Sequence, residues 1–165
     1  MKIHNFSAGP SILPQEVMKK ASKAVEELDD SGLSLIEISH RSKEFISIME
    51  EACELALKLT GLEGKGYKAL FLQGGATHQF SMVPYNFGYN TKEADYVLSG
   101  SWSKKAISEA SKIIKVNTIA SSEGKNFTYA PDPNDWKVSE KSAYLHFCPN
   151  ETIQGVAIHE PPIID

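Results

Sequence analysis

The chain has 165 residues, of which 41% are hydrophobic and 23% charged, a composition typical of a globular protein with a hydrophobic core. Its formal net charge of −4 argues against nucleic-acid binding, and it has neither an apolar run of the roughly 20 residues that cross a bilayer nor a secretory signal. We therefore expect a cytoplasmic protein with no nucleic-acid or membrane partner.

The first part of the chain predicts an extended arm followed by two helices. Residues 1–15 carry turn signals and are assigned to the arm. After Pro14, which suits the first turn of a helix, apolar residues recur at helical spacing until Gly32 ends the pattern. A second amphipathic helix is expected over residues 45–59, with Gly61 as its stop.

The second part alternates runs of strand length with helices. One helix is expected over residues 77–83, and another is expected to turn Trp102, Ala106, Ile107 and Ala110 inward. The alternation predicts an α/β fold around a largely parallel sheet. The expected strands cover residues 67–72, 95–98, 113–119, 143–148 and 155–158.

Three of these strands end in small or polar residues. In open α/β sheets, ligands bind beside the carboxyl ends of the strands. Ala76 and Thr77 open a helix whose free N–H groups would favour a phosphate. Trp102 offers a flat face to a planar ring, and Thr152 offers a hydroxyl. Each feature also has a structural interpretation, namely a simple turn, a core-packing tryptophan and a capping threonine.

Arg41 is the only arginine among the 17 basic residues, and it follows His40 in a polar loop. A guanidinium matches carboxylate and phosphate oxygens with a planar, permanently charged fork, which a lysine cannot copy. Arg41 is therefore a candidate for anion binding. The alternative is an arginine that anchors its loop through backbone carbonyls.

Several classes of site find no support in the sequence. The GGATHQF segment lacks the Gly-Lys-Ser/Thr of a P-loop and the G-x-G-x-x-G of a dinucleotide site, and no G-x-S-x-G elbow is present. None of the five histidines pairs at zinc-ligand spacing, so we expect no metal site. Cys53 and Cys148 are expected to be two reduced thiols.

Four motifs resemble the phosphoserine aminotransferase family within the class-V aminotransferases, and the likeness runs from the first residue to the last. The final motif is quite specific to that family. The motifs are Asn5-Phe6-Ser7-Ala8-Gly9-Pro10 with Leu13-Pro14, Ser39-His40-Arg41-Ser42-Lys43-Glu44-Phe45, Gln73-Gly74-Gly75-Ala76-Thr77 with Gln79-Phe80, and His146-Phe147-Cys148-Pro149-Asn150-Glu151-Thr152-Ile153.

The resemblance implies a pyridoxal 5'-phosphate enzyme of fold type I, whose large domain is a three-layer sandwich around a mostly parallel sheet. Members of the family are homodimers. They transfer an amino group between glutamate and 3-phosphohydroxypyruvate, yielding phosphoserine and 2-oxoglutarate in serine biosynthesis. Some also act in pyridoxine biosynthesis. The implied partners are thus small-molecule substrates and a second copy of the chain.

Carried over by position, the resemblance assigns cofactor binding to Ala76, Thr77, Trp102 and Thr152, and substrate binding to His40 and Arg41. Two positions depart from the family pattern. Many relatives have arginine in place of Thr77, so binding of the substrate phosphate must be partly redistributed. Some have serine in place of Ala8, which removes one substrate contact.

The resemblance also implies that the lysine forming the Schiff base lies beyond Asp165, so the chain carries no catalytic residue. Residues 16–165 are then an incomplete large domain that binds pyridoxal phosphate, and these 165 residues alone are expected to be inactive. Two alternatives stay open. One is another fold-type-I enzyme, such as a glyoxylate-type aminotransferase or a cysteine desulfurase, and the other is a short, non-enzymatic binding module.

Overall fold

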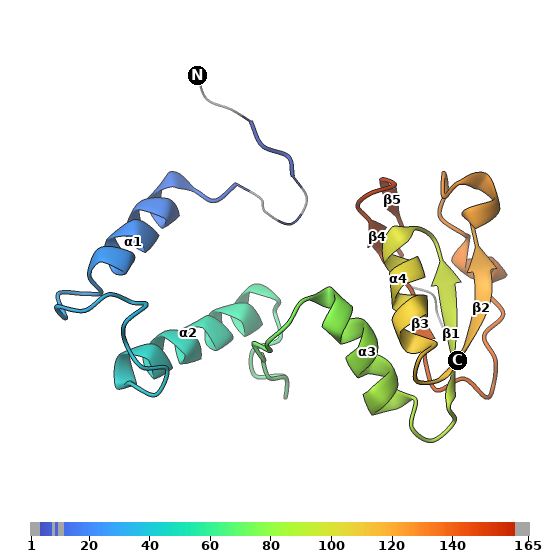
Figure 1. Cartoon of the computed structure of the whole chain (residues 1–165), viewed down its shortest axis with the longest axis horizontal. Helices are drawn as coiled ribbons and strands as arrows, with labels where there is room; N and C mark the ends of the chain where they lie inside the picture. The colour runs from blue at the N-terminus through green and yellow to red at the C-terminus, as the bar shows by residue number, and fades with distance from the viewer. Residues whose placement is uncertain (1–3, 8, 10–11, 161–165) are drawn as a thin grey trace. The chain divides into compact units, whose positions relative to one another are not determined.

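The computed structural model describes residues 4–7, 9 and 12–160, and the chain divides into two units after Leu72 (Figure 1). Ala8, part of the predicted arm and the last five residues lie outside this description. The division falls inside the predicted domain 16–165, whose boundaries stay a prediction. None of the helices in the described ranges is long and apolar enough to span a membrane.

The first unit, Met1–Leu72, contains the two predicted helices. Helix α1, Gln15–Glu26, starts directly after Pro14, and α2, Lys43–Leu59, starts after Ser42, whose hydroxyl accepts a hydrogen bond from the backbone N–H of Phe45 at 3.2 Å. Helix α1 ends well before Gly32, because the chain adopts an extended conformation at Glu27 and left-handed conformations at Asp29 and Asp30.

The strand predicted over residues 67–72 is wrong. These residues are in no strand, and large apolar side chains among them are exposed, Leu70 by 74% and Phe71 by 60%. A strand forms by pairing its backbone with a neighbour, and among the described residues no strand pairs with this segment. Apolar composition alone therefore does not produce a strand here.

The second unit, Gln73–Asp165, is built around a three-stranded parallel sheet in the order β2-β1-β3 (Figure 1). Its buried central strand is β1, Glu93–Leu98, flanked by β2, Lys115–Ser121, and the short β3, Leu145–His146. Parallel neighbours require crossover connections, which the intervening helix and loops supply. The predicted α/β class with a mostly parallel sheet is confirmed.

Helices α3, Ala76–Phe87, and α4, Ser101–Ala110, pack together beside the sheet. Ala106 and Ala110, two of the residues predicted to face inward, are buried in a core with Tyr96 of β1, and Ile107 packs against that core. The last turn of α3 leads through a short loop into the beginning of β1. The first turn of α3 therefore lies toward the other end of the sheet, where the strands have their carboxyl ends (Figure 1).

A second core contains Val97, Trp136 and Ile158. The strand expected over residues 143–148 is reduced to Leu145–His146, although Ala143 and Tyr144 still exchange backbone hydrogen bonds with β1. The second unit also contains short elements in its described part. They are the 3-10 turns η1, Glu123–Lys125, and η2, Pro133–Asp135, and a two-stranded antiparallel ribbon of β4, Asn150–Glu151, and β5, Val156–Ala157.

Candidate functional site

Trp102 and Thr152, fifty positions apart in the sequence, are joined by a hydrogen bond. The indole Nε1–H donates to the Thr152 hydroxyl oxygen at 2.8 Å. Trp102 lies in the first turn of α4 and is half-buried, whereas Thr152 directly follows β4 and is exposed. An aromatic face and a hydroxyl are thereby held side by side.

The start of α4 is fully occupied by the protein's own side chains. The Glu151 carboxylate accepts from the backbone N–H groups of Trp102 and Ser103, and the Gln154 side chain accepts from that of Ser101. The Ser103 hydroxyl accepts from the N–H groups that precede the helix. A ligand phosphate therefore finds no free backbone donor at α4.

The start of α3 is different, because its first two backbone N–H groups have no acceptor in the part of the chain that the structure describes. Its N-cap is Gly75, which has no side chain, and no partner among the described residues accepts from the N–H groups of Ala76 or Thr77. Both residues are exposed. Free N–H groups and the helix dipole together favour an anion such as a phosphate.

The turn that leads into α3 requires a glycine at position 74. Gly74 has a φ of +101°, and a Cβ there would lie 2.9 Å from Nδ1 of His78. A larger residue would strain the backbone and displace His78. The Gly-Gly pair is thus a tight turn that leaves the first N–H groups of α3 accessible.

The four predicted cofactor residues all belong to the second unit and lie on elements that begin or end near the carboxyl edge of the sheet. Only Trp102 and Thr152 are in direct contact. Three cavities of about 620–640 Å³ occur elsewhere, and none is lined by any of the four residues. Their assignment to the cofactor therefore stays a prediction.

The two predicted substrate residues belong to the first unit and are exposed. The Arg41 guanidinium has no hydrogen bond or ion pair with the residues that the structure describes, so nothing there supports the alternative of a loop anchor. His40 lines a hollow of about 620 Å³ together with Glu50 and Glu54, whose negative charges oppose an anion. Arg41 is the stronger candidate for binding an anion.

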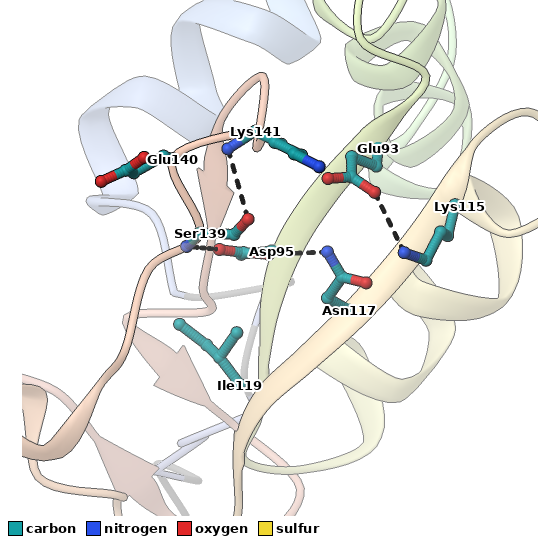
Figure 2. A pocket seen from close by; sticks show the side chains of 8 residues that line it. All are labelled: Glu93, Asp95, Lys115, Asn117, Ile119, Ser139, Glu140 and Lys141. Carbon is teal, nitrogen blue, oxygen red and sulfur yellow. Dashed lines mark hydrogen bonds and ion pairs between the residues drawn. The ribbon is translucent and has the colours of Figure 1, made fainter.

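A polar cavity of about 640 Å³ lies beside β1 and β2 (Figure 2). Asp95, fully buried, accepts from the Asn117 side chain at 3.0 Å and from the Ser139 backbone at 2.6 Å. At the rim, Lys115 and Glu93 form an ion pair at 3.0 Å. Glu93, Asp95 and Lys115 are thus satisfied within the protein, which favours a structural role for them. The other two charged side chains that line the cavity, Glu140 and Lys141, form no ion pair among the described residues.

Two titratable side chains near Glu151 are held uncharged by burial. Burial raises the pKa of the Cys148 thiol to about 12, and the Glu151 carboxylate adds to the shift. Burial lowers the pKa of His146, whose ring stacks on Tyr96 with centroids 4.8 Å apart. Because a thiol reacts as its thiolate, Cys148 is unsuited to act as a nucleophile at neutral pH.

Glu151 and Gln154, which cap the start of α4 beside the predicted site, are not among the residues predicted from the sequence. The sequence predicts only a polar break after the strand expected over residues 143–148, with Thr152 as its candidate residue. The available signal was a carboxylate in the polar segment after the apolar run 143–148, together with Gly100 at another strand end, which leaves space for it.

The family profile described as Aminotransferase class-V matches residues 3–165. The phosphoserine aminotransferase of Flavobacterium johnsoniae is 52% identical over 162 residues, covering 98% of this chain and 45% of the relative. That of Flavobacterium psychrophilum is 46% identical over 165 residues, covering 100% of this chain and 46% of the relative.

Solved structures give the same result. Phosphoserine aminotransferase from Bacillus circulans subsp. alkalophilus superposes with a TM-score of 0.88 at 40% identity, covering 96% of this chain and 44% of the other. PLP-bound phosphoserine aminotransferase from Trichomonas vaginalis superposes with a TM-score of 0.89 at 37% identity, covering 99% and 46%. The chain therefore spans a little under half the length of these relatives.

Proposed function

The chain belongs to the class-V aminotransferase family, and on that premise we propose that the whole protein is a pyridoxal-phosphate-dependent phosphoserine aminotransferase. It would transfer an amino group between glutamate and 3-phosphohydroxypyruvate in serine biosynthesis, and a related role in pyridoxine biosynthesis is compatible with it. We also propose that it acts in the cytoplasm as a homodimer.

The observation that carries this proposal is the hydrogen bond between Trp102 and Thr152. An indole N–H is a donor only, so the Thr152 hydroxyl must be the acceptor. Its own hydrogen is then available to an acceptor on a ligand. A flat ring lying on the indole face, with an oxygen at its edge near Thr152, fits both groups, and the pyridine ring of pyridoxal phosphate has such an oxygen.

The phosphate of the cofactor fits the start of α3, where the N–H groups of Ala76 and Thr77 are exposed and free. A phosphate there would gain charge-assisted hydrogen bonds and the favourable end of the helix dipole. Thr77 adds a hydroxyl where an arginine would add a full positive charge. The proposed cradle therefore relies on backbone donors more than on side-chain charge.

When bound, pyridoxal phosphate supplies the electron sink for amino-group transfer. In this chain, Trp102 and Thr152 would orient the ring, and Ala76 and Thr77 would hold the phosphate. Arg41 would bind an anionic group of the substrate with its unpaired guanidinium. None of these residues moves a proton in the proposed scheme, so their contribution is binding and orientation.

The test measures amino transfer by the complete protein with phosphoserine, alanine and cysteine as alternative donors to 2-oxoglutarate. We expect phosphoserine to be preferred by at least about a hundredfold in kcat/KM, since it alone carries a phosphate besides the α-carboxylate that all three donors share. Preference for alanine would indicate a different aminotransferase of fold type I, and release of sulfur from cysteine a desulfurase. Absence of transfer from all three donors would favour the binding module.

A further inference from the structure

Glu151 is a buried carboxylate, 1% exposed, that lies at the start of α4. One carboxylate oxygen accepts from the backbone N–H of Trp102 and the other from that of Ser103, both at 2.8 Å. No lysine, arginine or histidine forms an ion pair with it in the part of the chain that the structure describes. Its charge is therefore balanced by the two backbone donors and the positive end of the helix dipole.

The backbone is built to admit this carboxylate. The N-cap of α4 is Gly100, where serine, aspartate or asparagine would ordinarily cap the helix from its own side chain. A Cβ at Gly100 would lie 2.5 Å from the carboxyl carbon of Glu151. The local cap is thus replaced by a side chain from β4, about fifty positions later in the sequence.

The replacement has a geometric consequence, because Glu151 is adjacent to Thr152. Residue 151 holds the backbone of Trp102, and residue 152 holds its indole nitrogen. Residues 151 and 152 therefore hold both the backbone N–H and the indole N–H of Trp102. A capping side chain at position 100 would secure the helix but would not link the indole plane to the Thr152 hydroxyl.

We propose that Glu151 is a positioning residue that fixes the plane of Trp102 relative to the Thr152 hydroxyl. This inference rests on the proposed function, since the plane matters if Trp102 lies against the cofactor ring. Glu151 does not itself reach the ligand. It acts through the backbone N–H of Trp102, and its carboxylate is required because two donors need two acceptors.

The decisive variant is Glu151→Gln in the complete protein. A glutamine presents one acceptor oxygen and one NH₂ donor, so one of the two N–H groups loses its partner. We expect pyridoxal phosphate to bind about tenfold more weakly, the scale of one lost charge-assisted hydrogen bond, and its induced circular dichroism to decrease. Glu151→Asp, which keeps the charge but is one methylene shorter, serves if the glutamine variant does not fold.

The matched control is Gln154→Ala, which removes the cap on Ser101 at the same helix end without touching Trp102. It is expected to lower the thermal stability of the cofactor-free protein while leaving cofactor affinity within about twofold. Combining Glu151→Gln with Trp102→Ala forms a double-mutant cycle. If Glu151 acts through Trp102, Glu151→Gln adds little to the loss of affinity that Trp102→Ala already causes.

A measurement that needs no cofactor separates the positioning role of Glu151 from the proposed function of the protein. In protein labelled with 5-fluorotryptophan, the ¹⁹F signal of Trp102, identified by its loss in Trp102→Phe, should shift or broaden in Glu151→Gln and not in Gln154→Ala. An unchanged signal would overturn the positioning role, as would equal losses of affinity in the two variants. If the signal shifts in Glu151→Gln but the wild-type protein binds no pyridoxal phosphate, the proposed function is refuted, and with it the role of Glu151 toward a cofactor.

Discussion

Arg41 differs chemically from every other basic residue of the chain, since all the others are lysines. Its side chain is exposed and unpaired among the described residues, so the guanidinium fork is available to a ligand. A lysine at the same position would keep the charge but lose the planar, two-point geometry. Substitution by lysine therefore separates geometry from charge.

We expect Arg41→Lys in the complete protein to raise the KM for phosphoserine by about tenfold, since one bidentate contact becomes a point charge. Affinity for pyridoxal phosphate should change by less than about twofold. Steady-state kinetics and a cofactor titration measure the two quantities. Lys43→Ala, at the exposed start of α2, is the control for a general loss of positive charge. Equal weakening of substrate and cofactor would show that the loop is structural.

Strand β1 connects its neighbours through a buried side chain as well as through its backbone. Asp95 is fully buried and accepts from Asn117 of β2 and from the backbone N–H of Ser139, which precedes β3 (Figure 2). A buried carboxylate holds its place only when its acceptors are satisfied. Asp95 therefore couples the central strand to both of its flanking segments.

We expect Asp95→Ala to lower the free energy of unfolding by about 2 kcal/mol, because it leaves two half-buried donors without an acceptor. Hydrogen exchange should accelerate at Ser139 and its neighbours, and mass spectrometry of the corresponding peptides measures it. Glu93→Gln, which breaks an ion pair to an exposed lysine at the cavity rim, should cost less than about 1 kcal/mol. Unchanged exchange at Ser139 would contradict the coupling.

Helices were more predictable than strands in this chain. Helix α2 follows from local signals alone, with Ser42 as its cap and apolar residues at helical spacing. A strand depends on a partner distant in sequence, and residues 67–72 have none among the described elements. Short apolar runs therefore predict strands only when the rest of the sheet is known.

At the scale of the whole molecule, the first unit buries little of its apolar surface. Neither α1 nor α2 contains a fully buried residue, and side chains such as Leu55 and Leu59 are exposed by 47% and 86%. An apolar helix face of this kind is normally covered by another surface. The chain spans 45% of the relative from Flavobacterium johnsoniae, so a large part of the relative's own structure has no counterpart here.

We expect a protein of residues 1–165 alone to show no amino transfer. The family resemblance predicts that the lysine forming the Schiff base lies beyond Asp165. Lys104 and Lys105 are exposed on α4, with Lys104 paired to Glu123 at 2.7 Å. The activity is measured as release of 2-oxoglutarate from glutamate, with the short chain and the complete protein at equal concentration. Turnover by the short chain would refute this expectation.

The sequence by itself determined the α/β class, the helices and the family, because hydrophobic periodicity, capping residues and contiguous motifs are local properties of the chain. It also identified Trp102 and Thr152 as separate candidates. Only the tertiary structure showed that the two are hydrogen-bonded and that Glu151 holds the backbone beside them. Those contacts join residues about fifty positions apart, and no local pattern encodes which distant side chain will satisfy a buried donor.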